Sequence, residues 1–534
     1  MANAIQGRRG IAVAPHSLAS QSALAVLREG GNALEAMVAA AATIAVVYPH
    51  MNGIGGDSFW LVSTPTAGGA HDVVAIDGSG AAALGVNRDK YAGQSAIPFR
   101  GGSAAITMAG TISGWDQALA LSRDRLGGRL PLSRLMADAI DYATHGAPVT
   151  ASLARTVRGK RAELEGVHGF AETYMPGGEL PSTGTLFRQP RLAATLEHLA
   201  RAGLDDFYRG DLARTMAEDL QRAGSPLVLA DFTAHHGLLR EPLELAHRHG
   251  RIFNMPPPTQ GVVALIILGL MERLGIERFD HLSADYVHAA VESVKQAFAV
   301  RDREITDPAH MRLAAAELLT PAALDAMASR IDMACAAPWG AGKGPADTVW
   351  MGVIDGEGRA VSMIQSVYHE FGSGVVLARS GVNWQNRGAS FSLKPEHINT
   401  LAPGKKPFHT LIPGLALLAD GRTMVYGNMG GDGQPQSQSA VFTRTVVQGL
   451  NPQDAVSAPR WLLGRTWGQS TDSLKLESRF PAETVAALRA RGHEVDVLGD
   501  FDETFGHAGC LLRKPDGSLE GGFDPRSDGI VAAF

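Results

Sequence analysis

The sequence predicts an α/β fold in which helical layers lie on either side of β-hairpins. Two observations lead to this prediction: helical patterns occur both before and after residue 348, and paired apolar strands lie between them. A third is size, because 534 residues of which 45% are hydrophobic can bury a large core.

The chain is predicted to begin with two helices and a strand. In residues 16–30 apolar side chains recur at helical spacing, Ser17 is a plausible N-cap, and Gly30 with Gly31 would end the helix. The next segment, NALEAMVAAAATIAVVYPHM, is apolar nearly all round, which is typical of a buried helix. GIGGDSFWLV at 53–62 then reads as a Gly-rich turn leading into a strand.

Helical spacing recurs in later segments, namely 131–146, 191–202, 206–223, 254–275, 283–301, 437–448 and 482–491. Residues 331–347 are small, flexible and without periodicity, as expected of a linker. After the linker, TVWMGVIDGEGRAVSMIQSV predicts a β-hairpin, and short strands are expected at 423–427 and 509–512.

Composition and missing motifs exclude several classes of protein. A net charge of −6 offers no basic surface for nucleic acid. The apolar run at 38–48 is too short to span a bilayer, which takes about 20 residues. Because the chain begins without an apolar signal-peptide core, we expect a cytoplasmic location. Cys335 and Cys510 cannot form a disulfide framework and have no metal-ligand spacing around them, so no metal or cofactor is expected.

Thr348 stands where the linker meets the predicted strand, which raises the question whether it becomes a chain end. A hydroxyl is a weak nucleophile, but an N-terminal threonine carries its own base, the free α-amine. Cleavage between Asp347 and Thr348 would expose that amine, and a flexible loop ahead of a strand suits self-cleavage. Taken alone, the pattern more commonly marks the first residue of a strand.

Two other features have both a chemical and a structural interpretation. Gly430 and Gly431 lie between a predicted strand and a predicted helix, where their N–H groups could bind an oxyanion or where they only allow a tight turn. Arg100 and Arg387 lie in loops and could hold a carboxylate, although loop arginines are usually solvated.

Six segments together resemble the γ-glutamyltranspeptidase family of N-terminal nucleophile hydrolases, in content and in order. They are GGNALEAMVAAAATIAVVYPHMNGIGGDSFWLV, FRGGSAAITMAGTISGW, NMPPPTQG, DTVWMGVIDGEGRAVS, FGSGVV and GNMGGDGQPQ. The resemblance implies a four-layer αββα sandwich made from one precursor. It also implies that the precursor cuts itself into a large chain, 1–347, and a small chain, 348–534, which stay interwoven in one fold.

The resemblance also implies catalytic roles. Thr348 matches the nucleophile and new N-terminus. Ser366 stands where the family has a second threonine that hydrogen-bonds the nucleophile, so a hydroxyl is kept. Gly430 and Gly431 match the glycines of the family's oxyanion hole.

The charges of the pocket depart from those of the glutamyl-transferring members. Ser79 stands in place of an arginine that holds the substrate's α-carboxylate. After Gln385, an acidic pair that binds the α-ammonium is replaced by Asn386 and Arg387. One charge-assisted hydrogen bond contributes about 1.5–3 kcal/mol, so losing both anchors should weaken γ-glutamyl recognition well over tenfold.

Uncharged positions of the pocket differ as well. Tyr368 replaces an asparagine that helps to hold the glutamyl group, and His409 with Thr410 replaces a serine pair. We therefore expect the substrate to be bound by Arg387, Gln385, Tyr368, His409, Thr410 and Arg100.

The expected substrate is a small anionic amide without an α-amine. The sequence is similar to the family's branch of oxamate amidohydrolases, which has this chemistry. Arg387, Arg100 or His409 would then orient the carboxylate while Thr348 attacks the amide and releases ammonia. The implied partners are the two chains of one precursor, and a homo-oligomer of αβ heterodimers is a further option.

Three alternatives remain open at the sequence level. The chain could be a γ-glutamyltransferase or glutathione hydrolase, which a γ-glutamyl-anilide assay would reveal. It could be an uncleaved, inactive scaffold, although the retained Thr348, Ser366 and paired glycines argue against this. It could also act on larger amides, such as lactam side chains. Trp350, Trp384 and Tyr368 could line a pocket for them or simply fill the core.

Overall fold

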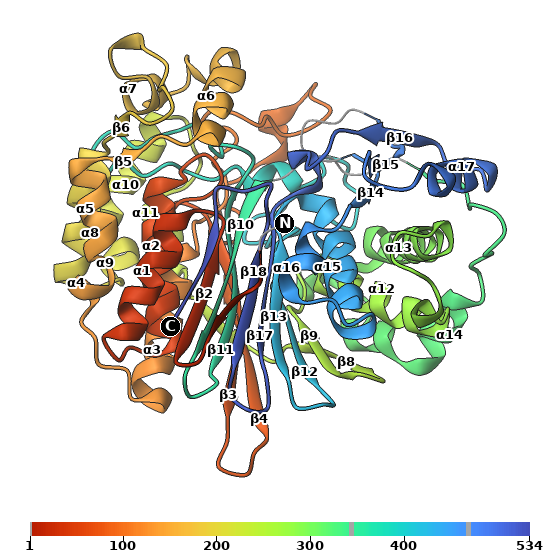
Figure 1. Ribbon diagram of the computed structural model, residues 1–534. Coiled ribbons are helices and arrows are strands. Elements are labelled where there is room, and N and C mark those ends of the chain that lie inside the picture. Colours follow the sequence, from red (N-terminus) through yellow and green to blue (C-terminus); the bar gives the residue numbers. More distant parts are fainter. Residues whose placement is uncertain (1–2, 341–346, 466–470) are drawn as a thin grey trace.

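Two seven-stranded antiparallel sheets stack face to face at the centre of the molecule, with helices outside each of them (Figure 1). The computed structural model describes residues 3–340, 347–465 and 471–534. Helices, sheet, sheet and helices follow one another across the molecule, which confirms the predicted αββα sandwich.

The first sheet, sheet I, has the strand order β19-β2-β10-β11-β3-β4-β7. Its strands are β19 (Ile530–Ala533), β2 (Gly10–Ala14), β10 (Asp347–Asp355), β11 (Ala360–Tyr368), β3 (Asp57–Pro65), β4 (His71–Gly78) and β7 (Leu238–Arg240). The second, sheet II, has the order β1-β18-β17-β13-β12-β9-β8. Its strands are β1 (Ile5–Gly7), β18 (Leu519–Phe523), β17 (Ala508–Arg513), β13 (Thr423–Asn428), β12 (Gly414–Leu418), β9 (Gly250–Asn254) and β8 (Leu243–His247).

The helices form two separate layers. Those on the side of sheet I are α1 (Ser17–Arg28), α2 (Ala33–Val47), α3 (Thr111–Leu126), α4 (Leu132–Leu135), α5 (Ala137–His145), α8 (Pro190–Ala202), α9 (Asp206–Arg209), α10 (Asp211–Arg222) and α11 (Leu229–Ala234). Those on the side of sheet II are α12 (Gly261–Arg273), α13 (Ala284–Glu304), α14 (Pro321–Ala328), α15 (Gln434–Phe442) and α16 (Pro452–Ser457).

Smaller elements cap the upper end of the sandwich as drawn in Figure 1. On the side of sheet I these are α6 (Ala151–Leu164), α7 (Phe170–Tyr174) and the pair β5 (Ala147–Pro148) and β6 (Leu186–Phe187). On the side of sheet II they are a small sheet of β14 (Trp461–Leu463), β15 (Leu474–Glu477) and β16 (Val495–Leu498), with α17 (Ala482–Ala490) beside it.

Alternation along β10 divides its side chains between two cores. Val349, Met351 and Val353 point into the core between sheet I and its helices, whereas Trp350 and Ile354 point into the core between the sheets. This period of two is what a strand buried on both faces requires. Thr348 precedes this run at the start of the strand.

Strands from before and after residue 347 are mixed in both sheets. In sheet I, β10 and β11 lie between β2 and β3 of the first part. In sheet II, β18, β17, β13 and β12 lie between β1 on one side and β9 and β8 on the other, and these three flanking strands come from the first part of the chain. Each sheet therefore combines strands from both parts of the chain.

The predicted elements agree with the structure in type more often than in boundary. Every residue of α2 is buried, as its composition predicts. The prediction of Ser17 as N-cap is wrong: the helix starts there and His16 caps it by accepting from the Leu18 N–H. The single helix predicted over 206–223 is broken at Gly210, whose backbone is extended.

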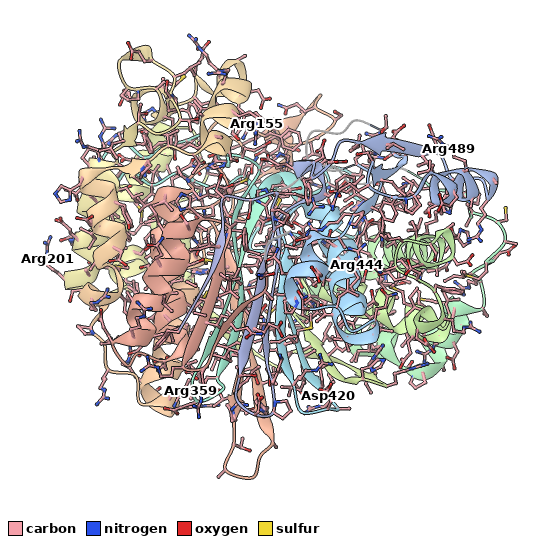
Figure 2. All side chains as sticks on the ribbon, viewed as in Figure 1. Arg155, Arg201, Arg359, Asp420, Arg444 and Arg489 are labelled. Atoms are coloured by element: carbon pink, nitrogen blue, oxygen red, sulfur yellow. The ribbon has the colours of Figure 1, made fainter. Side chains whose placement is uncertain are left out.

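The exposure of a charged side chain depends on its place in the layers. Figure 2 shows Arg201 and Arg489 on the outer helices, where both are exposed, and Arg444 inside the layer of helices on sheet II, where it is buried. Within the described residues, no helix is long and apolar enough to cross a membrane.

Trp350 locks β10 against the facing sheet. Its indole ring lies on glycines of sheet II, so close that a Cβ added at Gly427 would lie 2.0 Å from Trp350 Cδ1 and one added at Gly509 would lie 2.4 Å from Cζ3. The indole Nε1 donates to Ser362 Oγ at 2.9 Å. The start of β10 is thereby fixed relative to β13 and β17.

We expect Gly427→Ala to lower the melting temperature, because the added methyl group overlaps the Trp350 ring and overpacking costs about 1–3 kcal/mol. Differential scanning calorimetry measures the change. Gly68→Ala is the control, since a Cβ there meets no atom within 4 Å. Adding Trp350→Phe to Gly427→Ala should recover part of the loss. Unchanged melting of Gly427→Ala would show that the sheets can separate to admit a methyl group.

Candidate active site

Thr348 lies where the register of β10 is irregular. Asp347 pairs with Tyr368 on β11, and two residues later Val349 pairs with Gln365, so β11 carries one extra residue at this point. Such bulges turn side chains at the ends of strands and occur near functional sites.

The Thr348 hydroxyl is enclosed by protein. The residue is 1% exposed, and Gln434 Nε2 donates to Thr348 Oγ1 at 3.4 Å. The segment 341–346, which belongs to the predicted flexible linker before the cleavage site, lies outside the described residues.

Ser366 lies on the neighbouring strand, close to the same bulge. It pairs with Asp57 across β11 and β3, is fully buried, and accepts a hydrogen bond from the Tyr368 N–H at 2.8 Å. Tyr368 has a φ of 85°, a conformation that aromatic residues rarely adopt. This backbone strain lies where substrate-binding residues are predicted, as strain often does at functional sites.

Gly430 and Gly431 form the turn between β13 and α15. Their φ angles are 114° and 51°. Both positions favour glycine, because a residue with a Cβ atom is strained in this left-handed region. The Gly433 N–H closes the turn by donating to Gly430 O at 2.7 Å. Gln434, the first residue of α15, follows this turn, and its side chain reaches Thr348 at the start of β10.

A buried polar network holds this turn in place. Gln260 Nε2 donates to Gly431 O and to Thr410 O, each at 3.0 Å. Arg301 Nη1 in turn donates to Gln260 Oε1 at 3.3 Å and to Asp432 Oδ1 at 2.9 Å. The segment NMPPPTQG therefore contributes a positioning side chain, Gln260, to which the sequence assigned no role.

Arg387 is the most unusual charged group of the site. Its side chain is 1% exposed, its guanidinium lies 3.9 Å from the centre of the Tyr368 ring, and Nη1 donates to Thr410 Oγ1 at 3.3 Å. Nε and Nη2 have no hydrogen-bond acceptor among the described residues. Burial lowers the pKa of Arg387 to about 10, so the group is still cationic at neutral pH.

Asp57, Gln385 and His409 form a buried polar cluster near Arg387, whose charge acts on both Asp57 and His409. Asp57 Oδ1 accepts from Gln385 Nε2 at 3.1 Å and from the N–H groups of Gly80 and Gly110 at 3.1 and 3.0 Å. Asp57 Oδ2 lies 3.5 Å from His409 Nε2. In the part of the chain that the structure describes, Asp57 Oδ2, Gln385 Oε1 and both His409 ring nitrogens lack a hydrogen-bond partner.

Burial shifts the titration of this cluster. It raises the pKa of Asp57 to about 7, against the opposing effects of the Arg387 charge and of the hydrogen bonds to Oδ1. It also holds the pKa of His409 well below its usual value, with the charges of Arg387 and Lys406 acting in the same direction. Below pH 7 the cluster therefore carries mainly the positive charge of Arg387.

The contacts of Arg100 do not support its predicted role. Its Nη1 donates to the carbonyl oxygens of Glu370 and Gly372 at 2.7 and 2.6 Å, and its Nη2 lies 3.0 Å from Glu163 Oε2. The guanidinium is thus occupied in fastening the loop after β11. Of the two arginines predicted to hold a carboxylate, only Arg387 has guanidinium nitrogens without a hydrogen-bond acceptor among the described residues.

Lys406 is a cation that sequence reasoning missed. Its Nζ lies 2.7 Å from Asp77 Oδ2 and 3.2 Å from Ser79 Oγ. A positive charge therefore still stands beside Ser79, although an arginine is absent at that position. The only sequence signal was its place three residues before His409, because the segments that carry Lys406 and Ser79 meet through tertiary structure alone.

One cluster outside the site has metal-ligand chemistry: the ligand atoms of His288, Glu292 and His493 lie within 4.8 Å of one another. The two imidazoles are hydrogen-bonded directly, with 2.7 Å between His288 Nδ1 and His493 Nε2. Lys295 Nζ lies 2.7 Å from Glu292 Oε1. Because an ammonium group already balances the carboxylate, these contacts fit a hydrogen-bonded network better than a metal centre.

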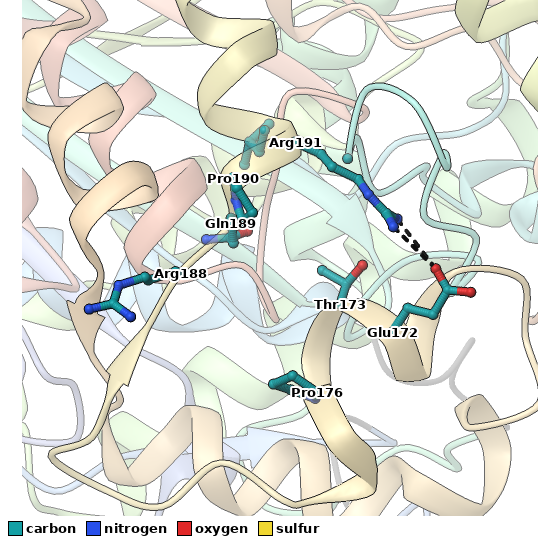
Figure 3. A pocket seen from close by; sticks show the side chains of 9 residues that line it. Glu172, Thr173, Pro176, Arg188, Gln189, Pro190 and Arg191 are labelled. Atoms are coloured by element: carbon teal, nitrogen blue, oxygen red, sulfur yellow. Dashed lines mark hydrogen bonds and ion pairs between the residues drawn. The ribbon is translucent and has the colours of Figure 1, made fainter.

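A surface cavity of about 220 Å³ lies away from these residues (Figure 3). Thr173, Gln189 and Pro190 line it, and Arg191 there forms an ion pair with Glu172. None of the predicted site residues lines this cavity.

A protein family and several known proteins match nearly the whole chain. The family described as gamma-glutamyltranspeptidase matches residues 19–534. The oxamate amidohydrolase proenzyme of Klebsiella pneumoniae is 58% identical over 525 residues, 98% of each chain. The glutathione hydrolase-like YwrD proenzyme of Bacillus subtilis is 40% identical over 534 residues, 100% of each chain.

A solved structure has the same fold. The crystal structure of a cephalosporin acylase from Bacillus halodurans has a TM-score of 0.91 and 33% sequence identity, covering 100% of this chain and 97% of that one. The chain is thus similar over its full length to hydrolases that are named for different substrates.

We expect Asp57→Asn to raise the melting temperature relative to the wild type by an amount that grows between pH 4 and pH 7. The carboxyl ionises near pH 4 in the unfolded chain but only at about pH 7 in the folded one. The folded state therefore loses stability as pH rises through this window and no further above it. A neutral amide of the same shape avoids this loss and keeps the oxygen that accepts the three N–H groups.

Calorimetry of both proteins at pH 5, 6, 7 and 8 measures the difference. A difference that does not change with pH would contradict the raised pKa of Asp57. Asp72→Asn, at an exposed position of β4, is the control for a general effect of net charge.

Proposed function

The chain belongs to the γ-glutamyltranspeptidase family, and from this premise we propose that it is a self-processing amidohydrolase with an N-terminal threonine nucleophile. The proposed substrate is a small anionic amide such as oxamate, from which it releases ammonia. The observation that carries the substrate class is Arg387, whose guanidinium is buried with two nitrogens that no described residue accepts from.

The energetics of Arg387 favour a bound anion. An unpaired buried charge is strongly destabilising, and a partner that pairs with it relieves several kcal/mol. Guanidinium groups match carboxylates because two N–H groups can donate in parallel. The Tyr368 ring on one face of Arg387 and the Thr410 hydroxyl at Nη1 fix the orientation of the remaining donors.

In the proposed maturation the chain is its own first substrate. Thr348 Oγ1 attacks the carbonyl carbon of Asp347, the bond from that carbon to the Thr348 nitrogen breaks, and an ester forms as the nitrogen becomes an amine. Water hydrolyses the ester, leaving chains 1–347 and 348–534. Strands of both parts are hydrogen-bonded neighbours in each sheet, which supports the proposal that the two chains stay together after the cut.

In the proposed reaction the new α-amine of Thr348 takes the hydroxyl proton while Oγ1 attacks the amide carbon. N–H groups at Gly430 and Gly431 stabilise the oxyanion. The amine passes the proton to the departing nitrogen, which leaves as ammonia, and an oxalyl ester remains. Water, deprotonated by the same amine, hydrolyses this ester to oxalate and restores Thr348. A carboxylate held by Arg387 keeps the adjacent amide carbon in place.

The 58% identity to an oxamate amidohydrolase supports this substrate over the alternatives. The γ-glutamyl alternative has one structural observation in its favour: Lys406 puts a cation beside Ser79, where an α-carboxylate is held in glutamyl-transferring members. The similarity to a cephalosporin acylase likewise keeps larger amides as a candidate class. A cytoplasmic location, and association of the cut protein into a larger oligomer, stay predictions.

We expect the purified protein to give two masses, those of 1–347 and 348–534, and Thr348→Ala to give one. Intact mass spectrometry measures this, and peptide mapping locates the cut. Thr348→Ser is the control, because it keeps the hydroxyl and should still be cut. If the wild type stays as one chain after long incubation, the scaffold alternative replaces this proposal.

We expect Arg387→Met to raise the KM for oxamate at least tenfold, because about 1.5–3 kcal/mol is lost for each charge-assisted hydrogen bond. Ammonia release measures the rate, with a γ-glutamyl anilide assayed in parallel. Arg191→Met, which removes an exposed arginine at the cavity of Figure 3, is the control and should change neither parameter. An unchanged KM in Arg387→Met would remove Arg387 from the substrate site. Faster turnover of the anilide than of oxamate in the wild type would favour the γ-glutamyl alternative.

A further inference from the structure

We infer that Gln434 is a further catalytic residue, which donates from its side-chain amide to Thr348 Oγ1 during both self-cleavage and substrate hydrolysis. The inference rests on the proposed role of Thr348 as nucleophile. Gln434 is fully buried, and its Nε2 lies 3.4 Å from Thr348 Oγ1.

The orientation of the Gln434 amide is set by the backbone. Its Oε1 accepts from the Ile412 N–H at 3.2 Å. A backbone N–H can only donate, so a flipped amide would set two donors against each other. The NH₂ end must therefore face Thr348, and the side chain acts as a donor toward Oγ1.

A donor at Oγ1 determines where the threonine's own proton can go. One lone pair of Oγ1 accepts the N–H of Gln434, so the hydroxyl proton must point away from Gln434 toward another acceptor. This is also the direction that the proton must take when a base removes it. The same N–H stabilises the negative charge that develops on Oγ1 as the proton leaves. The contact is longer than an ordinary hydrogen bond, and it should shorten as that charge develops.

The position of Gln434 is fixed by its surroundings. It follows the turn at Gly430 and Gly431 directly and begins α15, so the proposed oxyanion donors and this donor belong to one short segment. Ile412 is held from both sides, because its N–H donates to Gln434 and its carbonyl oxygen accepts from Gln438 Nε2. The loop that carries His409 and Thr410 is thereby joined to the helix that carries Gln434.

Another glutamine of the same helix offers a matched control. Gln436 is also fully buried, but its amide bonds only the backbone: Nε2 donates to Asp432 O and Leu463 O, and Oε1 accepts from the Leu463 N–H. Replacing Gln436 therefore tests the loss of a buried amide on α15 without touching the Thr348 hydroxyl.

The experiment compares Gln434→Met, Gln434→Glu and Gln436→Met with the wild type. Each precursor is made by cell-free synthesis, and its self-cleavage is followed by intact mass at pH 5 to 8. The cut proteins are then assayed for kcat and KM with oxamate, and melting temperatures are recorded. Because self-cleavage needs no added substrate, its rate is independent of whether oxamate is the correct one.

We expect Gln434→Met to slow self-cleavage and to lower kcat by about ten- to a hundredfold, with KM little changed, because a donor to the reacting oxygen is lost. Gln434→Glu should respond to pH. A protonated carboxyl can donate to Oγ1, whereas a carboxylate can only accept. The ratio of its cleavage rate to that of the wild type should therefore fall as pH rises. Gln436→Met should lower the melting temperature without this pH-dependent ratio.

Two results would overturn the inference and leave the proposed function in place. One is Gln434→Met cleaving within about threefold of the wild type, since an N–H donor to a reacting oxygen contributes more than that. The other is the same loss in all three variants, independent of pH and parallel to the fall in melting temperature, which would indicate a structural role. A wild type that stays uncut overturns this inference together with the proposed function. A wild type that cuts itself but does not hydrolyse oxamate overturns only the substrate.

Discussion

The position of β10 is the constraint on which the remaining structure depends. This strand pairs with β2 on one edge and β11 on the other, packs Val349 and Met351 against the helices of sheet I, and presses Trp350 onto glycines of sheet II. A strand held on both edges and both faces cannot slip by one residue, because slipping would turn every side chain to the opposite core. Thr348 therefore has one fixed place relative to the turn at Gly430 and Gly431.

At the positions predicted to bind the substrate, the protein keeps polar groups in a state that folding alone does not favour. Arg387, Asp57 and His409 are buried with polar atoms that lack partners within the described residues, and Tyr368 has a strained backbone. Groups of this kind reduce stability and are retained where a ligand completes them. By contrast, the supporting network of Gln260, Arg301 and Asp432 is mutually bonded. The site thus combines a satisfied frame with an unsatisfied interior, as expected of a preorganised binding site.

Much of the fold could be predicted from local patterns. The apolar composition of α2 predicted a helix buried on all sides, and the hairpin of β10 and β11 followed from two apolar runs around a Gly-containing turn. Helix boundaries were less accurate where capping depends on one side chain, as with His16 at α1, or where one glycine interrupts an apolar pattern, as with Gly210. The roles of Thr348, Ser366, Gly430 and Gly431 came from the resemblance to the family, since each has a common structural interpretation when taken alone.

The sequence by itself determined the helices and strands, the layered class and, through its family segments, the proposed nucleophile, because these are written in residue order and spacing. Only the tertiary structure decided which polar groups of the predicted site find partners. In the folded protein Arg100 binds Glu163 and carbonyl groups of the loop after β11, whereas Arg387 is buried with two nitrogens that have no hydrogen-bond acceptor among the described residues. Folding also places Lys406 beside Ser79, and the Gln434 amide within reach of the Thr348 hydroxyl. The reason is that hydrogen bonds and charges act through space between residues far apart in the chain, so no local pattern records whether a buried polar group finds its partner.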